Sequence, residues 1–497
     1  MPKKLLFIMV AAILFWGCGK KISPDPGDTV IEASAAKADL RTFASILKKA
    51  HPSLYLYLPE KRFDFLTDSL SSTITTTVTL NDFFNKLYCI VGRVGCSHTD
   101  IAMPPAVYDS LQNRQFFFPF PVEWIDGRLL VNVRGYDLSQ GTEIRRINGK
   151  PAETIIRELM LYNSVEGLSR ETQKRMAGTD FSFQYYLKYG PQKLFNLEVT
   201  DTSGMEKTVK MPSIKLSEWE QRFSGDIYYF DDVSVGHDLN INDANGYAIM
   251  RISTFEFNQE KQQQAFEHFC NNSFELLRAK PNITNLIIDL RQNPGGDLYN
   301  AFYLFSYLAR EPFLQYATVY SKVSKLPFSN LLDEEFSGDK ETEINQSIAE
   351  KFTQRVKSGY WKYADSFNRQ WVPDPNAFKG KIFLVTNAKV NSAASYFALM
   401  VKNSGIGTIV GEETAGGSYS GNGFTTIKYK LPNTGIRLFF PYAHIVYNYK
   451  PEKNNARGLE PNYLVPDDRE SFKKNTDRQL YFIIDSLISG LVTNNKR

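Results

Sequence analysis

Ser392 is the first residue whose type and setting are suited to nucleophilic chemistry. It follows an apolar stretch, 381–386, and a short loop, 387–391, and it opens the helical run SAASYFALMVKN. A serine hydroxyl is a weak nucleophile unless a base takes its proton, and this stretch contains no base. Taken alone, Ser392 is therefore more simply interpreted as a helix N-cap, a position at which serine is favoured.

His98 is a candidate for the missing base. It lies in GRVGCSHTDI, after a glycine turn and a small polar pair. Because the imidazole pKa is close to neutral, histidine suits general-base catalysis. An isolated histidine is more often a partly buried polar residue, so His98 carries little weight without a partner.

A glycine pair offers a candidate anion-binding turn. In IIDLRQNPGGDLYNAF, an apolar strand ends near Asp289, passes through Gly295 and Gly296, and enters a helix near Asp297. Glycines let the backbone approach a ligand closely, and free N–H groups at a helix start stabilise negative charge. The turn could serve as an oxyanion hole, although such turns are also common as purely structural connections.

Alternating elements in the C-terminal half must position these residues. Continuous apolar runs at 285–290, 381–386 and 407–411 predict strands that are covered on both faces, and helical stretches follow the first two. This alternation predicts an α/β layer domain over residues 214–490.

Two further segments are expected before this domain. Helical periodicity over 35–112 predicts a helical N-terminal domain that carries His98. Residues 113–213 contain short strands with an Asp126-Gly127 hairpin signal. Within them, GTEIRRINGKPAETIIREL predicts a strand at 143–147, an Asn-Gly turn and a helix. This order resembles the core of PDZ domains, which bind extended peptides at a sheet edge, although a generic hairpin plus helix is the simpler alternative.

The N-terminus has the features of an export signal. Two lysines precede twelve apolar residues, too few to span a bilayer but typical of a secretory signal, and Gly17-Cys18 follows. The pattern resembles the bacterial lipoprotein box, which implies a signal peptide over 1–18, lipidation at Cys18 and a tether over 19–34. We expect a location in the cell envelope, with the membrane contacted through the lipid; an ordinary signal peptide is the alternative.

Composition limits the remaining possibilities. A chain of 497 residues is too long for one core, and 58 basic against 54 acidic residues gives no excess charge that would indicate a nucleic-acid partner. The five histidines and four cysteines show no HExxH or CxxC spacing. We therefore expect no metal and no cofactor.

Three motifs in order resemble one enzyme family. NLIIDLRQNPGGD, KVNSAASYFALM and TIVGEETAGGSYSGNG are similar to segments of the tail-specific (C-terminal processing) and tricorn-core serine peptidases. The resemblance implies a ClpP/crotonase-like catalytic fold, Ser392 as nucleophile, and an oxyanion hole formed by the N–H of Ala393 with that of Gly295 or Gly296.

The same resemblance separates two candidate bases. Tail-specific enzymes carry a lysine about 25 residues after the serine, but this chain has Gly417 there, and Asn403 replaces the accessory aspartate of that branch. The tricorn-like branch instead uses a histidine in a G-T-S-H loop, which Gly95-Cys96-Ser97-His98 matches with one change. The resemblance thus implies His98 as base, with Ser97 as a supporting hydroxyl.

The acid that would orient His98 is less clearly marked. The tricorn-like pattern has a glutamate roughly sixty residues after the serine, where YKPEKNNARGLEPN offers Glu452 and Glu460. Glu452 is preferred on spacing.

These features predict an exported serine endopeptidase that acts on proteins or peptides. One alternative is a catalytically inactive peptide- or ligand-binding lipoprotein on the same fold. A crotonase-type acyl-CoA enzyme is another, although export to a compartment without acyl-CoA counts against it. The sequence leaves the oligomeric state open.

Overall fold

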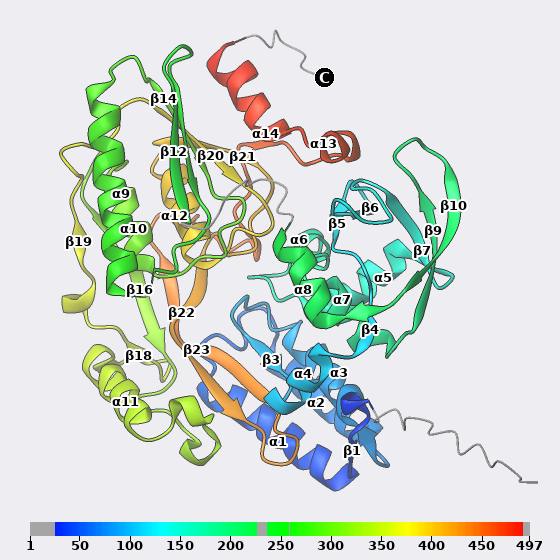
Figure 1. The fold of residues 1–497 in the computed structure, drawn as a ribbon. Coiled ribbons are helices and arrows are strands. Elements are labelled where there is room, and N and C mark those ends of the chain that lie inside the picture. Colours follow the sequence, from blue (N-terminus) through cyan, green and yellow to red (C-terminus); the bar gives the residue numbers. More distant parts are fainter. Residues whose placement is uncertain (1–24, 226–235, 258, 491–497) are drawn as a thin grey trace, which may run out of the picture.

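The computed structural model describes residues 25–225, 236–257 and 259–490 (Figure 1). The expected signal peptide and Cys18 lie outside these residues. The described part of the expected tether is folded: Pro26–Asp28 form a 3-10 turn, η1, and Val30–Ile31 form strand β1, which pairs with β2 (Val78–Thr79). No helix within the described ranges is long and apolar enough to cross a membrane.

The C-terminal half is built on a six-stranded sheet in the order β12-β13-β14-β20-β21-β24, parallel from β13 onward. The three strands expected from the apolar runs are confirmed. The strands are β12 (His237–Asn242), β13 (Tyr247–Ile252), β14 (Asn285–Asp289), β20 (Lys381–Thr386), β21 (Gly407–Gly411) and β24 (Tyr463–Leu464).

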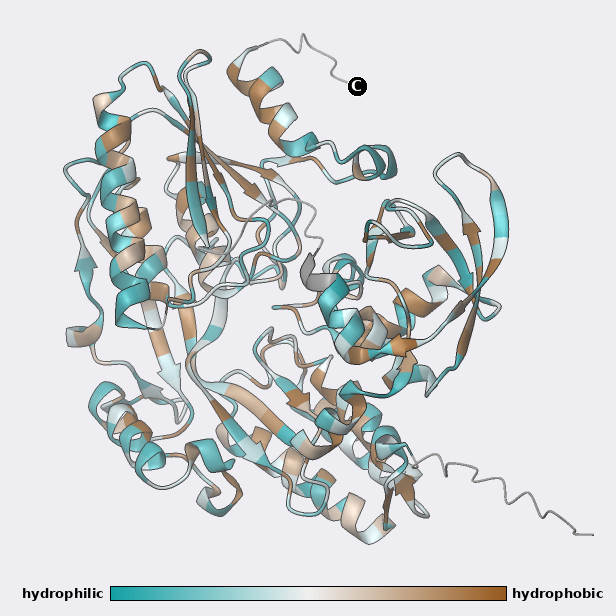
Figure 2. Ribbon diagram, viewed as in Figure 1, coloured by the Kyte–Doolittle hydropathy of each residue, from teal (hydrophilic) through white to brown (hydrophobic). Residues whose placement is uncertain are grey.

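Helices cover both faces of this sheet (Figure 1). Leu286 and Ile288 of β14 belong to the large core that α9, α10 and α12 share, whereas Ile287 packs with the C-terminal helical turns. Burial on both faces explains why the central strands β14, β20 and β21 are largely apolar, as their brown colour in Figure 2 shows. The helices are α9 (Glu260–Ala279), α10 (Leu298–Ser306), α12 (Ser392–Asn403), α14 (Arg478–Tyr481) and the π-helical η6 (Phe482–Ile488).

A second sheet joins the N-terminal part of the chain to the C-terminal half. Its order is β17-β18-β16-β23-β22, and the short strand β3 (Asp100–Ala102) pairs antiparallel with β23, with Ile101 opposite Leu438. Because β3 begins two residues after His98, this pairing fixes the His98 loop to the C-terminal half. The other strands are β16 (Tyr316–Ser321), β17 (Gln354–Arg355), β18 (Trp361–Lys362), β22 (Ser420–Lys430) and β23 (Arg437–Tyr447).

The N-terminal helices form as expected but share the core of the C-terminal half. Phe43 and Leu87 belong to the same buried cluster as Leu438 and Phe440 of β23. The fully buried Asp39 of α1 also accepts hydrogen bonds from backbone and side-chain groups of residues 433–434, in the β22–β23 turn. The helices are α1 (Ala33–Ala50), α2 (Glu60–Thr73), α3 (Leu80–Val91) and α4 (Pro105–Gln112).

The β-rich segment has its own hydrophobic core. Its antiparallel sheet has the order β10-β9-β7-β6-β5, and β8 pairs with β7. The Asp126-Gly127 hairpin, the strand at 143–147 and the following helix are confirmed. The elements are β5 (Val122–Ile125), β6 (Arg128–Val131), β7 (Glu143–Ile147), β8 (Lys150–Pro151), α5 (Ala152–Leu159), η2 (Met160–Tyr162), α6 (Arg170–Met176), α7 (Phe181–Tyr189), β9 (Leu194–Thr200) and β10 (Glu206–Pro212).

Candidate active site

Ser392 is the first residue of α12 and adopts an unusual backbone conformation. Its φ is +49°, in the left-handed region that non-glycine residues rarely occupy, and the N-cap position belongs to Asn391. Such a conformation costs about 1–3 kcal/mol and persists only when the surrounding structure enforces it. Ser392 is therefore not a capping serine, and its strained position is of the kind found at functional sites.

His98 lies directly against Ser392, although 294 residues separate them in the chain. His98 Nε2 is 2.9 Å from Ser392 Oγ, a hydrogen-bonding distance. The pairing of β3 with β23 brings the His98 loop to this position. A nucleophile and a base at this separation are what an activated serine requires.

Ser97 and Glu166 continue the contacts on the far side of the imidazole. Ser97 Oγ is 3.1 Å from His98 Nδ1 and 3.5 Å from Glu166 Oε2, and the Ser97 N–H donates to the same carboxylate oxygen at 3.2 Å. Glu166 is only 2% exposed, and its N–H donates to the carbonyl of Ala415. The structure thus places an acid one hydroxyl away from the histidine.

Glu166 fills the space that a residue larger than glycine would need at position 417. A Cβ added to Gly417 would lie 2.7 Å from Glu166 Cγ and 2.4 Å from the carbonyl oxygen of Ser420. A lysine at 417 and a glutamate at 166 are therefore sterically incompatible in this arrangement.

The glycine turn packs against the start of α12. A Cβ added to Gly295, whose φ is +109°, would lie 2.5 Å from Ser392 Cβ and 3.1 Å from the Ala393 nitrogen. The Gly295 N–H is already bonded to Asn293 Oδ1 at 2.8 Å. In the part of the chain that the structure describes, the N–H groups of Ala393 and Gly296 have no hydrogen-bond acceptor, so these two remain available to an anion.

A buried polar network centred on Asn422 holds the His98 loop against the second sheet. Asn422 of β22 donates to Cys96 Sγ at 3.0 Å and to Ser53 Oγ at 2.8 Å, and its carbonyl oxygen is 2.9 Å from His444 Nδ1. These contacts join the N-terminal helical segment, the His98 loop and the second sheet around one amide. The loop is consequently held by tertiary contacts on several sides.

Burial shifts the pKa values of both titratable groups beside Ser392. Loss of hydration lowers the pKa of His98 to about 4, so the imidazole is neutral at pH 7 and can accept a proton. Burial raises the pKa of Glu166 to about 8, and the hydrogen bonds from Ser97 oppose this shift only in part. The carboxylate therefore forms mainly above neutral pH.

Three side chains at this site, those of Cys96, His98 and Glu166, are of types that can bind a metal ion and lie close together. Ligand atoms of Cys96, His98 and Glu166 all lie within 4.8 Å of one another. Burial, followed by the charge of Glu166, raises the pKa of the Cys96 thiol to about 12, which disfavours the thiolate that metal binding needs. The expectation of a metal-free site stays a prediction that chelation can test.

The structure does not bring the acids expected from spacing to His98. Glu452 is exposed, and no described hydrogen bond joins it to the imidazole. Glu460 pairs with Arg457 at 3.0 Å. The sequence analysis did not identify Glu166 as a site residue, because Glu166 lies in an insertion of the β-rich segment, far from the three family motifs. The only local signal is that this acidic residue stands between an apolar residue, Val165, and a glycine, Gly167.

The chain was compared with known families and structures. Residues 246–465 match the model of Peptidase family S41. A search of curated proteins found no match. Mature CPAF complexed with lactacystin shares 17% identity and a TM-score of 0.64, covering 92% of this chain and 98% of its own.

Two more distant structures also align. The photosystem II D1 C-terminal processing protease has a TM-score of 0.41 at 11% identity, covering 88% of this chain and 94% of its own. The tricorn protease has a TM-score of 0.38 at 14% identity, covering 92% of this chain and 37% of its own. The CPAF likeness shows the fold. The Peptidase family S41 match covers residues 246–465 in the C-terminal half, which is therefore the catalytic half, and the chain is a serine-type peptidase.

Proposed function

We propose that this protein is an exported endopeptidase that cleaves peptide bonds through a Ser392/His98 mechanism. The observation that carries the proposal is the 2.9 Å contact between Ser392 Oγ and His98 Nε2. A neutral imidazole at that distance can take the hydroxyl proton as the oxygen attacks a carbonyl. A catalytically inactive binding protein would gain nothing from holding a serine in a strained conformation against a neutral histidine, so this geometry favours the enzyme.

The proposed mechanism gives each proton a direction. With the neutral imidazole protonated at Nδ1, His98 Nδ1–H donates to Ser97 Oγ, and the Ser97 hydroxyl donates to Glu166 Oε2, which leaves Nε2 free to accept the Ser392 proton. As Ser392 attacks, His98 becomes an imidazolium, and the Glu166 carboxylate stabilises that charge through Ser97. His98 then gives the proton to the leaving amine, and water releases the acyl group by the reverse sequence.

The proposed oxyanion hole consists of the backbone N–H groups of Ala393 and Gly296. Negative charge develops on the carbonyl oxygen during attack, and donors fixed beforehand stabilise it without reorganisation. Ala393 lies in the first turn of α12, where the helix dipole adds to the effect. Gly295, the other expected donor, instead keeps the turn close to Ser392.

An activity-based experiment tests this mechanism. A fluorophosphonate probe should label the wild-type chain at Ser392, and unfolded casein should be cleaved. Ser392→Ala and His98→Ala should each abolish both signals while leaving the circular dichroism spectrum unchanged. Ser404→Ala, at the C-terminal end of the same helix, is the matched control and should react like wild type. Full labelling of Ser392→Ala would refute the assignment.

We further propose that Cys18 carries a lipid and that the protein is anchored at the cell envelope. The support is the N-terminal sequence pattern. Metabolic labelling with an alkyne fatty acid should tag the wild type and not Cys18→Ala, and the variant should leave the membrane fraction. Unchanged labelling of the variant would contradict lipidation at this residue.

The β-rich segment, 113–213, is proposed to be a PDZ-like module that holds extended peptides. The order of strand, Asn-Gly turn and helix supports this proposal, as does the separate core. Deleting the whole module would also remove Glu166, which contacts the His98 loop, so loss of fluorophosphonate labelling in a deletion variant would not report on peptide binding. Point variants on the edges of the module's sheet are the better test, because they should weaken peptide binding and leave labelling of Ser392 unchanged.

A further inference from the structure

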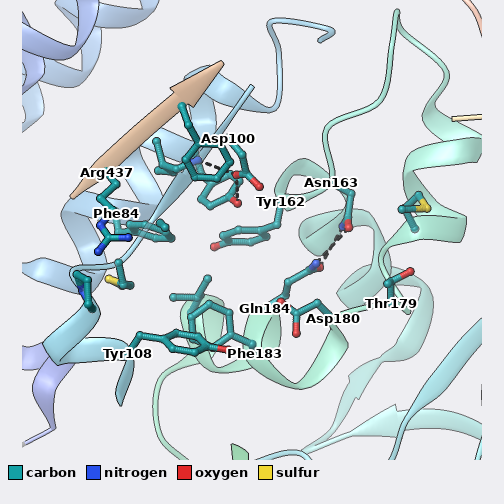
Figure 3. A pocket seen from close by; sticks show the side chains of 18 of the residues that line it. Phe84, Asp100, Tyr108, Tyr162, Asn163, Thr179, Asp180, Phe183, Gln184 and Arg437 are labelled. Atoms are coloured by element: carbon teal, nitrogen blue, oxygen red, sulfur yellow. Dashed lines mark hydrogen bonds between the residues drawn. The ribbon is translucent and has the colours of Figure 1, made fainter. Parts of the chain in front are cut away.

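A cavity of about 530 Å³ lies between the N-terminal helices and the insertion of the β-rich segment (Figure 3). Its walls come from α3, β3 and α4 on one side and from η2 and α7 on the other, with β23 closing one end. Neither Ser392 nor His98 lines it. This volume is typical of sites for small ligands.

Aromatic side chains form much of the cavity wall. Tyr162 reaches toward the centre from η2, and Phe183 and Tyr108 face it from α7 and α4 (Figure 3). The rings of Tyr108 and Phe183 pack edge to face with centroids 5.6 Å apart, and Tyr162 packs against Tyr88 at 5.0 Å. Ring faces of this kind attract cations within about 6 Å.

Two carboxyl groups face the same space. Asp100 accepts hydrogen bonds from Tyr88 Oη and from the N–H of Ile101. Asp180 occupies the N-cap position of α7, yet its side chain makes no capping bond, and no described hydrogen bond or ion pair uses its carboxylate. Asp180 therefore presents an uncompensated acid to the cavity.

The basic group on the cavity wall does not neutralise these acids. Arg437 lines the end of the cavity, but its guanidinium Nε is 3.1 Å from Asp333 Oδ2, a buried carboxylate outside the wall. The exposed Asp109 adds a further negative charge among the lining residues. The described wall is thus aromatic and net acidic.

We propose that this cavity binds a ligand ending in an ammonium or guanidinium group. The cation would pair with Asp180, while its alkyl chain lies against Tyr108, Tyr162 and Phe183. A free organic amine and a lysine or arginine side chain of a peptide share this chemistry.

The environment of Asp180 agrees with the proposal. Burial, followed by the charges of Glu220 and Asp100, raises the pKa of Asp180 to about 7. A cation bound beside the carboxylate would remove this penalty, whereas a neutral ligand of the same shape would not.

Saturation-transfer NMR titrations test the proposal on the full chain carrying Ser392→Ala, which keeps peptides intact. The probes are cadaverine, acetyl-lysine amide and the neutral analogue 1-pentanol. Both cations should bind saturably, and 1-pentanol should bind at least tenfold more weakly. Tighter binding of cadaverine would identify a free amine as the ligand, and tighter binding of the lysine amide would identify a peptide side chain.

Matched variants locate the site. Asp180→Asn should weaken binding of both cations at least tenfold, whereas Asp137→Asn, at an exposed aspartate outside the cavity, should leave it unchanged. Phe183→Leu keeps an apolar wall but removes a ring, and it should weaken cation binding about threefold even if Asp180→Asn does not fold. Absence of saturable cation binding, or equal binding to Asp180→Asn and wild type, would overturn the proposal.

Discussion

Replacing Glu166 by glutamine tests the assignment of the acid most directly. The substitution keeps the size of the side chain and an acceptor for Ser97 but removes the charge opposite the imidazolium. His98 and Glu166 present atoms no more than 4.8 Å apart. At that distance and an effective dielectric constant of about 20, a unit charge pair contributes about 3.5 kcal/mol. Since each ~1.4 kcal/mol of activation free energy is about tenfold in rate, kcat should fall roughly 300-fold, with little change in KM, when it is measured above pH 8, where the Glu166 carboxylate is formed.

The pH profile gives a second readout of the same variant. Because the pKa of Glu166 is raised to about 8, the carboxylate forms as pH rises through that value, and wild-type kcat should increase there. The pKa of His98, near 4, places the histidine limb well below this range. In Glu166→Gln the rise near pH 8 should disappear. Kinetics with a fluorogenic peptide between pH 5 and 9.5 measure both effects.

The rival acids supply the controls. Glu452→Gln and Glu460→Gln should retain wild-type kcat and the wild-type pH profile, since Glu452 is exposed and Glu460 pairs with Arg457. If Glu452→Gln loses activity while Glu166→Gln keeps it, the proton path through Ser97 is refuted and the expectation from spacing is restored.

Four further results are expected. Gly295→Ala should lower kcat at least ~100-fold in a folded protein, because the new methyl group would lie 2.5 Å from Ser392 Cβ; wild-type turnover would disprove the close packing. Asp39→Ala should lower the free energy of unfolding by roughly 3 kcal/mol in urea titrations, since the backbone and side-chain donors of residues 433–434 lose the buried carboxylate that accepts from them; a change below 0.5 kcal/mol would count against this anchor. Glu166 should make the free energy of unfolding fall as pH rises from about 4.5 to 8, because the folded state holds its proton more tightly than the unfolded chain, whereas His98 contributes in the opposite direction in both proteins; calorimetry should therefore show that the stability of wild type relative to Glu166→Gln falls over this range. Dialysis against EDTA should leave peptidase activity unchanged, and a loss restored by Zn²⁺ would show that Cys96, His98 and Glu166 hold a metal.

Local sequence patterns sufficed to predict the elements of the catalytic half. Strands buried on both faces must be apolar throughout, so 285–290, 381–386 and 407–411 were recognisable without any partner. The Asp126-Gly127 hairpin and the strand, turn and helix at 143–159 were equally local, because their turns need residues that tolerate positive φ. The tether was different: pairing between β1 and β2 gives structure to residues whose composition alone indicates a flexible linker.

Side-chain type and neighbouring motif were enough to propose the nucleophile, the base and the glycine turn from the sequence. The proposed acid, in contrast, became apparent only in the three-dimensional structure. Glu166 lies at the site because the β-rich segment packs against the His98 loop, and this contact cannot be inferred from the distance between residues along the chain. Its side chain occupies the volume beside Gly417. The contact between His98 and Ser392 likewise depends on the pairing of β3 with β23, because a 294-residue separation is closed by sheet pairing and shared core packing, not by local sequence.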